Sequence, residues 1–400
     1  MQKDKYLQIF NNCVLSKLIF KHVKSINNVI SKNSSARFRW SDLIKLPYVM
    51  AGNFYLNELK QYYADHSIYP HLDETFRAIF KSKNLEALKY LVSLVKPISR
   101  TKYITANFDS ILCSAAEYGS LEIVKYICTE FEKKRLNYYQ ALIKAPFSGD
   151  IEIVKYLNEQ LDACDQSRIC RDYDYETGVV FDSAAKMGRI DMIELLTESR
   201  SDDRENCNMY YGAIQGGHLH VVQYLIDIGE PTSLFPNMDY GTLFDYSIYC
   251  NQLEIAKLLY HNNMRQSSRT AIDFAASHGN IECLKWLHEN TTVSASVKAM
   301  DNAAYNNNLE VLKWLQQHRT EGCSQSVLDV VCTKGYTDVT RWLHENQPIV
   351  YQCSQPIYWA ITNGHLELSK WLLENRTERP TTSAIDFAAP STDTWIALNG

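Results

Sequence analysis

The sequence predicts an all-α fold, a solenoid in which short helix-turn-helix units stack on one another, and three observations support this. One pattern recurs along the chain: an apolar residue, two small residues, two variable residues, a Gly or Asn, and then an amphipathic segment. In that segment apolar residues lie three apart, as at Leu121, Val124 and Ile127, which is helical spacing. The Gly or Asn is a residue type that tolerates the left-handed conformation with which many helices end.

Ten copies of the second segment can be located by the residue that opens each of them. These residues are Leu85, Leu121, Ile151, Ile190, Leu219, Leu253, Ile281, Leu309, Thr337 and Leu366. The last four intervals measure 28 or 29 residues, whereas the earlier intervals run from 29 to 39. We therefore expect regular repeats toward the C-terminus and longer loops before them. Pro146 falls inside the first helix of the third repeat and predicts a distortion there.

Two residues before most of these opening positions the chain carries Gly or Asn. The positions are Gly119, Gly149, Gly188, Gly217, Asn251, Gly279, Asn307, Gly335 and Gly364. We expect left-handed backbone at each of them, which would end the first helix and let the chain reverse. A small pair such as Ala275-Ala276 lies one turn earlier, where it would allow close packing of the two helices.

A recurring Asp lies two residues before the small pair. It is found at Asp182, Asp245, Asp273, Asp301, Asp329 and Asp386. In the first turn of a helix a carboxylate meets unpaired backbone N–H groups and the positive end of the helix dipole. The sequence therefore predicts that each Asp stabilises the start of its own helix.

These residues resemble the ankyrin repeat, whose pattern runs Thr-Pro-Leu-His-x-Ala-Ala-x-x-Gly-His-Leu-Glu-Val-Val. Residues 363–368 (Asn-Gly-His-Leu-Glu-Leu) and 217–222 (Gly-His-Leu-His-Val-Val) match its second part closely. The resemblance spans residues 76–389, although the Thr-Pro-Leu-His opening is mostly lost and Asp often replaces its His. It implies an all-α ankyrin-repeat solenoid that binds a partner protein and is not an enzyme.

The domain boundaries follow from where the pattern fades. We expect an N-terminal helical cap over 1–75 with a degenerate repeat near 56–60, an array of ten units and a partial eleventh over 76–389, and a tail over 390–400. Residues 6–30 have helical apolar spacing, which favours a cap for the solenoid end. Alternatively, residues 15–23 (Leu-Ser-Lys-Leu-Ile-Phe-Lys-His-Val) resemble part of an F-box, without its Leu-Pro opening, and imply a ubiquitin-ligase substrate adaptor.

Composition excludes several other classes of protein. A formal charge of −5 gives no electrostatic reason to expect nucleic acid, and no apolar run is long enough for a membrane helix or a signal peptide. The eleven cysteines are scattered without a Cys-x-x-Cys pair, so we expect reduced thiols that act as small apolar residues. We expect a monomer in the cytoplasm, with the nucleus as second choice.

Catalytic and metal-binding signatures are absent from the sequence. We find no phosphate loop, dinucleotide-binding turn, nucleophile elbow or zinc helix. His288-Glu289 and His344-Glu345 each lack a second His one turn later, so we interpret them as solvated helix ends. Cys164 and Cys170 have no matching His and are interpreted as a loop. We therefore expect no cofactor and no metal.

One aromatic residue recurs just before the last core Leu of the second helix. The column consists of Tyr90, Tyr126, Tyr156, Tyr224, Trp286, Trp314, Trp342 and Trp371. A stacked ladder at the interfaces between repeats is the favoured interpretation, because each ring can bury a large apolar area. A binding stripe on the outer face is the alternative.

The resemblance also implies a binding surface, because ankyrin repeats use the two variable residues before the Gly on their concave side. Carried over by position, these are Glu117, Tyr118, Lys186, Met187, Tyr249, Cys250, Ser277, His278, Tyr305, Asn306, Thr333, Lys334, Thr362 and Asn363. Three tyrosines and one histidine among polar neighbours suit a protein interface. Any exposed pair of residues would look as varied, so both interpretations stay open at this point.

Overall fold

The computed structural model describes most of the chain between residues 45 and 377. The described ranges are 45–66, 71–98, 108–131, 136–163, 179–232, 242–264, 270–348 and 355–377. Every regular element in these ranges is a helix, which confirms the all-α fold. None of these helices has both the length and the apolar character needed to cross a membrane. The cap helix predicted over residues 6–30 and the predicted tail lie outside the described residues.

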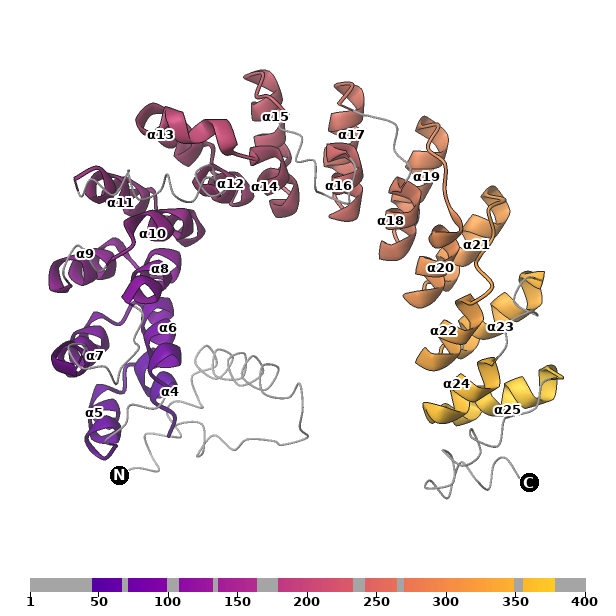
Figure 1. Ribbon diagram of the computed structural model, residues 1–400, viewed down its shortest axis with the longest axis horizontal. Helices are drawn as coiled ribbons and strands as arrows, with labels where there is room; N and C mark the ends of the chain where they lie inside the picture. Colours follow the sequence, from indigo (N-terminus) through magenta and orange to yellow (C-terminus); the bar gives the residue numbers. More distant parts are fainter. Residues whose placement is uncertain are drawn as a thin grey trace, which may run out of the picture. The chain divides into compact units, whose positions relative to one another are not determined.

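The chain divides into two compact units, Met1–Asp172 and Tyr173–Gly400, which we describe separately. The domain boundaries expected at residues 75 and 389 stay predictions. In the N-terminal unit the described helices form consecutive pairs (Figure 1): α4 (Pro47–Gly52) with α5 (Leu56–Ala64), α6 (Leu72–Ser82) with α7 (Leu85–Ile98), α8 (Phe108–Tyr118) with α9 (Leu121–Glu130), and α10 (Tyr138–Lys144) with α11 (Ile151–Ala163). A 3₁₀ turn, η2 (Ala145–Ser148), follows α10 where Pro146 predicted a distortion.

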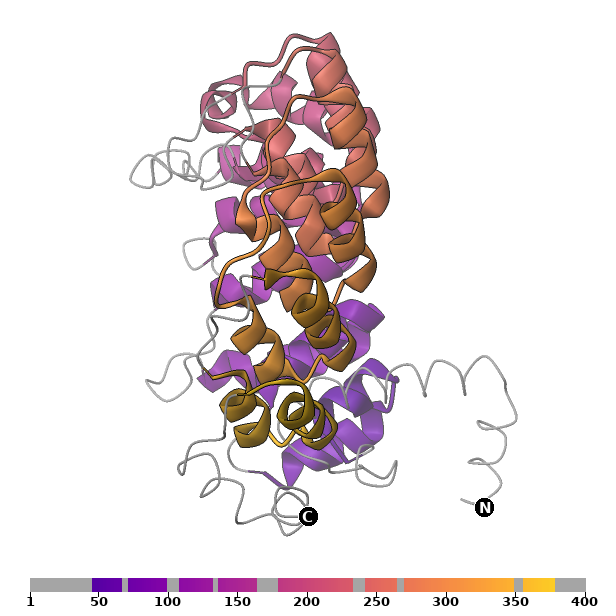
Figure 2. The same cartoon turned by 90° about the vertical axis from the view of Figure 1, so that its right-hand side faces the viewer.

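The C-terminal unit repeats the same arrangement of pairs (Figures 1 and 2). They are α12 (Val179–Lys186) with α13 (Ile190–Ser199), α14 (Met209–Gly216) with α15 (Leu219–Asp227), α16 (Leu243–Tyr249) with α17 (Leu253–His261), α18 (Ala271–His278) with α19 (Ile281–Asn290), α20 (Val297–Tyr305) with α21 (Leu309–His318), α22 (Val327–Lys334) with α23 (Thr337–Asn346), and α24 (Pro356–Thr362) with α25 (Leu366–Asn375). A 3₁₀ helix, η4 (Ser201–Asn206), follows α13.

The first helices of successive pairs pack side by side in each unit, and each second helix packs against its own first helix. All ten predicted opening residues are the first residues of second helices, from Leu85 of α7 to Leu366 of α25. Residues 56–60, where a degenerate repeat was expected, lie in α5, which packs against α4 and α7. The helical period was therefore sufficient to place these boundaries.

The turn between the two helices of a pair is left-handed at most of the predicted positions. Glycines such as Gly279 and Gly364 have φ between 71° and 76°, and Asn251 and Asn307 have φ of 58° and 59°. The prediction is wrong for Gly119, which has no positive φ. A Cβ there would lie 2.4 Å from the carbonyl oxygen of Ala115, so this glycine provides space rather than a left-handed turn.

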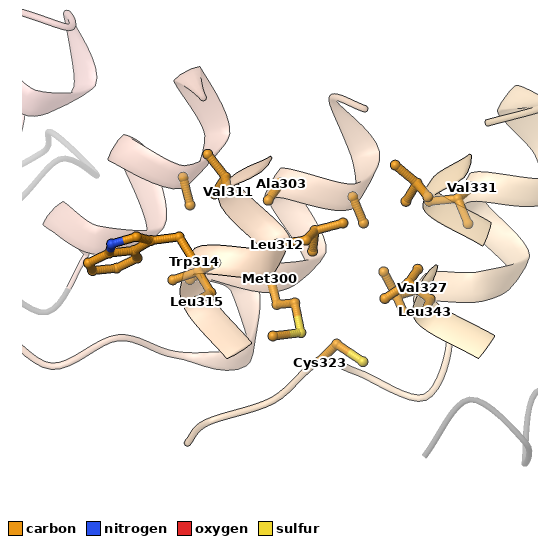
Figure 3. Packing of buried hydrophobic residues seen from close by; sticks show 14 of the residues in the cluster. Met300, Ala303, Val311, Leu312, Trp314, Leu315, Cys323, Val327, Val331 and Leu343 are labelled. Carbon is orange, nitrogen blue, oxygen red and sulfur yellow. The ribbon is translucent and has the colours of Figure 1, made fainter. Parts of the chain in front are cut away.

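One continuous apolar core runs through the C-terminal unit from α16 to α25. Figure 3 shows part of it, where Leu312 of α21 lies among side chains of α20 and α22. The small pair Ala303-Ala304 is fully buried, as close helix packing requires. Cys323 and Cys332 are buried thiols in this core, in agreement with cysteines that act as apolar residues. No helix pair could bury this much apolar surface alone.

The aromatic column packs against the preceding helix pair. Trp314 is 8% exposed and its ring centroid lies 5.7 Å from that of His288 in α19. Trp371 of α25 lies 5.3 Å from His344 of α23. Trp286, Trp342 and Trp371 are half-buried against the core. These contacts support the interpretation of the column as a ladder between repeats.

As predicted, the recurring Asp lies in the first turn of its helix at Asp182, Asp245, Asp273 and Asp329. Its hydrogen bonds, however, mostly reach the next repeat. Asp273 of α18 accepts hydrogen bonds from the backbone N–H (3.0 Å) and the hydroxyl (2.6 Å) of Ser296, which precedes α20. Asp301 of α20 accepts one from the N–H of Ser324 (2.8 Å) in the next repeat. The side chain projects toward the neighbouring pair, where an incoming loop presents an N–H without a helical partner.

Asp182 and Asp245 complete this series in different ways. Asp182 of α12 accepts a hydrogen bond from the backbone N–H of Asn208, just before α14. Asp245 is the local exception, because its own N–H and its carboxylate both bond to the hydroxyl of Thr242, the N-cap residue of α16. The carboxylates of Asp182, Asp273 and Asp301 thus connect one helix pair to the next.

Replacing one of these carboxylates tests how much the hydrogen bonds between repeats contribute to the stability of the fold. We expect Asp273→Ala to lower the free energy of unfolding by about 1–3 kcal/mol, since it leaves two partly buried donors of Ser296 without their acceptor. Chemical denaturation of the full chain measures this. Glu282→Ala, which removes an exposed carboxylate from α19, is the matched control. Equal effects of the two changes would contradict the role given to Asp273.

Asp182 gives the C-terminal unit a predictable pH dependence. Burial raises the pKa of Asp182 from 3.8 to about 7, although the hydrogen bond from Asn208 acts in the opposite direction. Because the folded pKa lies above the unfolded one, the stability contributed by the protonated carboxyl is complete below pH 3.8 and is lost as the pH rises to about 7.

We therefore expect the melting temperature of the natural chain to fall relative to that of Asp182→Asn when the pH is raised from 5 to 8. The amide cannot ionise, so the comparison cancels the titration of all other groups. Calorimetry of both chains at the two pH values provides the measurement. A melting-temperature difference that does not change with pH would contradict the raised pKa.

Nearest-neighbour stacking predicts which helices a defect in the core destabilises first. We expect Trp314→Asp to cost at least about 3–5 kcal/mol and to increase hydrogen exchange first in α19, α21 and α23. Hydrogen exchange followed by mass spectrometry resolves these helices. Lys313→Asp changes the exposed neighbouring residue and should leave the exchange pattern intact. A uniform rise along the chain would rule out the nearest-neighbour description.

Candidate functional site

The variable residues predicted to bind a partner lie at the C-terminal ends of the first helices. Tyr118, Tyr249 and Tyr305 are 38%, 39% and 49% exposed, which is unusual for large aromatic side chains. The remaining exposed positions are His278, Asn306, Lys334 and Asn363. The half-buried positions are Glu117, Lys186, Met187, Cys250, Ser277, Thr333 and Thr362.

In the C-terminal unit the structure joins several of these residues across neighbouring repeats. The ring N–H of His278 donates to the carbonyl oxygen of Tyr249 at 2.6 Å. Asn306 donates its amide N–H to the hydroxyl of Ser277 at 3.3 Å. The ammonium of Lys334 lies 4.9 Å from the ring centroid of Tyr305. The second residue of one pair therefore contacts the first residue of the pair before it.

Other predicted residues do not belong to this row. Lys186 is the last residue of α12 and Met187 follows it. The position in α14 that corresponds to Met187 is Gly216, where a Cβ would lie 2.2 Å from the carbonyl oxygen of Lys186. No side chain can cross between the two helices there. Tyr118 lies in the N-terminal unit, where Lys81 sits 4.9 Å above its ring and a hydrogen bond with Glu117 raises its pKa.

Sequence reasoning missed three apolar residues on the preceding turn of the first helices. Val330 and Trp359 are each 38% exposed, and the half-buried Phe274 lies 5.2 Å from Tyr249 in an edge-on contact. Each lies three or four residues before a predicted position, so helical spacing places it on the same face. That spacing was the signal available in the sequence.

We call the resulting surface of the C-terminal unit the aromatic face. It consists of Tyr249, Phe274, His278, Tyr305, Val330, Lys334 and Trp359. These residues come from the five first helices α16, α18, α20, α22 and α24, whose backbones are fixed by the core behind them. The face is therefore a rigid row of rings and polar groups.

The first helices and the second helices of these pairs differ in their exposed charges. On the described residues of α16, α18, α20, α22 and α24 no carboxylate is exposed, because Asp245 and Asp273 are buried and Asp301 and Asp329 are half-buried. Burial raises the pKa of both Asp273 and Asp329. The second helices of the same pairs carry the exposed carboxylates Glu254, Glu282, Glu289, Glu310, Asp338, Glu345, Glu367 and Glu374.

A small pocket at the start of α14 offers no reactive group. Cys207, Tyr210 and Glu230 are among the residues that line it. Burial, together with the charges of Asp182 and Glu230, raises the pKa of the Cys207 thiol to about 12. A thiol with so high a pKa stays protonated at neutral pH and is a poor nucleophile.

The candidate metal ligands considered from the sequence do not form a cluster. No group of three or more His, Cys, Asp or Glu side chains converges within the described ranges. His288 is exposed, as expected for a solvated helix end, whereas His344 is half-buried against Trp371. Cys164 and Cys170 lie outside the described residues.

Two family models match the C-terminal unit, one described as ankyrin repeats in many copies over residues 243–288 and one as ankyrin repeats in three copies over 300–383. The chain contains ankyrin repeats. The matched segments hold helices α16 to α25, so the aromatic face is built on ankyrin helix pairs. No curated protein of similar sequence matches the chain. Within these residues the matches confirm the ankyrin resemblance, including the Gly-His-Leu stretch at 363–368, and the all-α fold that it implied.

Proposed function

We propose that this protein is a non-enzymatic scaffold that holds a partner protein on the aromatic face. Ankyrin repeats generally mediate protein–protein interactions, and proteins built from them are typically not enzymes. The observation that carries the proposal is the row of exposed rings at Tyr249, Tyr305 and Trp359, which lie on the alternate first helices α16, α20 and α24. Exposed apolar groups that form a contiguous patch on a rigid scaffold commonly mark an interaction site.

The contacts of these rings favour binding of a partner. Tyr249 is already held by Phe274 and by the hydrogen bond between His278 and its carbonyl oxygen. A ring that is ordered before binding loses little conformational entropy when a partner covers it. Aromatic side chains with polar tips account for many of the residues that dominate interface energies.

A paired substitution tests the proposal. We expect partner proteins captured by the full chain from cytosolic extract to be lost on Tyr249→Ala with Tyr305→Ala, since each ring typically contributes about 2 kcal/mol or more at an interface centre. Mass spectrometry of the captured proteins is the measurement. Glu282→Ala with Glu310→Ala alters the second-helix layer and should leave the captured set unchanged.

Two outcomes would redirect the proposal. If the captured partners survive the tyrosine substitutions, the aromatic face is not the binding surface. If ubiquitin-ligase subunits bind the full chain and are lost from a chain lacking residues 1–30, the F-box-like adaptor becomes the better hypothesis. The cytoplasmic location expected from the sequence is part of this proposal, and imaging of the tagged chain in cells tests it.

A further inference from the structure

We propose that the partner segment held on the aromatic face is acidic and presents an aromatic or aliphatic side chain between its carboxylates. This inference rests on the proposed scaffold function and names the chemistry of the partner. It combines the rings of the aromatic face with the absence of exposed carboxylates from the first helices that carry it.

The charge pattern follows from the connections between repeats. The carboxylates of Asp273 and Asp301 are committed to Ser296 and Ser324 of the following repeats. Asp329 is half-buried, and a backbone hydrogen bond from Gln355 opposes the rise in its pKa that burial causes. The carboxylates of these helices therefore point between the repeats and not toward a ligand on the surface.

The cations of the same helices remain outside. Lys298 and Lys334 are exposed, as is the side chain of His278. Lys298 precedes Tyr305 by seven residues in α20, which places both on one side of the helix. Lys334 lies over the Tyr305 ring at 4.9 Å. A cation thus stands near each end of α20 with the exposed ring beside one of them.

The spacing of these groups fits a short extended segment. Seven residues of helix span about 10 Å, and an extended peptide covers that distance in about three residues. A peptide with carboxylates three or four residues apart could meet both lysines while an intervening apolar side chain contacts Tyr305. Complementary charge of this kind mainly sets specificity and the rate of association.

A polyanionic nucleic acid fits the face less well than a protein segment. Proteins that bind duplex DNA through its backbone typically neutralise several phosphates, on the order of 6–10 contacts in well-bound cases. The described first helices α16, α18, α20, α22 and α24 expose two lysines, Lys298 and Lys334, and one histidine, His278. Rings edged by two lysines are better matched to a few carboxylates and an apolar anchor.

Selection of peptides tests the inference directly. A phage-displayed library of random 12-residue peptides is selected on the full chain, with counter-selection on the Tyr249→Ala, Tyr305→Ala chain. We expect the enriched peptides to carry net negative charge and at least one aromatic or aliphatic residue. Their affinity, measured by fluorescence anisotropy of the synthesised peptides, should fall as the salt concentration rises.

Charge reversal supplies the matched comparison. Lys298→Glu with Lys334→Glu should weaken the selected peptides at least about tenfold, since both cations are replaced by repelling charges. Lys285→Glu with Lys370→Glu makes the same change of charge on exposed residues of the second helices and should leave affinity unchanged. Melting curves that match the natural chain confirm that each variant is folded.

The outcomes separate this inference from the scaffold function. Enriched peptides that are neutral or basic, but still depend on Tyr249 and Tyr305, would overturn the acidic partner and leave the scaffold. Peptides that bind the tyrosine variant equally well, or no enrichment over it, would overturn both. A 20-nucleotide single-stranded DNA that binds more tightly than the peptides and depends on Lys298 and Lys334 would replace the protein segment with a nucleic acid.

Discussion

Each helix pair in this protein buries its apolar surface against a neighbouring pair, and the other features of the structure depend on that stacking. The core of the C-terminal unit extends through the described helices from α16 to α25 without an interruption between pairs. Two short helices alone enclose too little apolar volume to be stable. A pair is therefore stable because of the pairs before and after it, and the aromatic column reinforces each junction.

Stacking by apolar contact alone would leave the separation of neighbouring pairs loosely specified, because the hydrophobic effect has no direction. The inward-facing aspartates add directional contacts. Asp273 reaches Ser296 and Asp301 reaches Ser324, so each hydrogen bond ties a helix to the residue from which the next first helix is approached. The backbone N–H groups that they satisfy would otherwise be costly to bury.

The same arrangement shapes the binding face. Because the carboxylates point between repeats, the outer side of the first helices shows rings, amides and lysines, and the acidic groups are exposed on the second helices. The backbone under Tyr249 and Tyr305 is fixed by the core, which limits the entropy lost when a partner binds. Stability and recognition thus use different sides of the same short helices.

The sequence by itself determined the helical period, the repeat boundaries and most of the left-handed turns. These are local properties, and residues such as Leu121 and Gly279 express them wherever the neighbouring repeats lie. The ankyrin resemblance, carried over by position, pointed to Tyr249 and Tyr305. Helical spacing could have located Phe274 and Trp359, one turn earlier on the same helical face.

Only the tertiary structure decided which atoms meet across repeats. The carboxylate of Asp273 points toward Ser296, which lies 23 residues further along the chain. The close approach that requires a glycine at Gly119 depends on the exact path of the turn. The commitment of the carboxylates that leaves Lys298 and Lys334 exposed on the face depends on contacts between repeats as well. Such contacts depend on the separation and rotation of adjacent helix pairs, which the period of one segment does not encode.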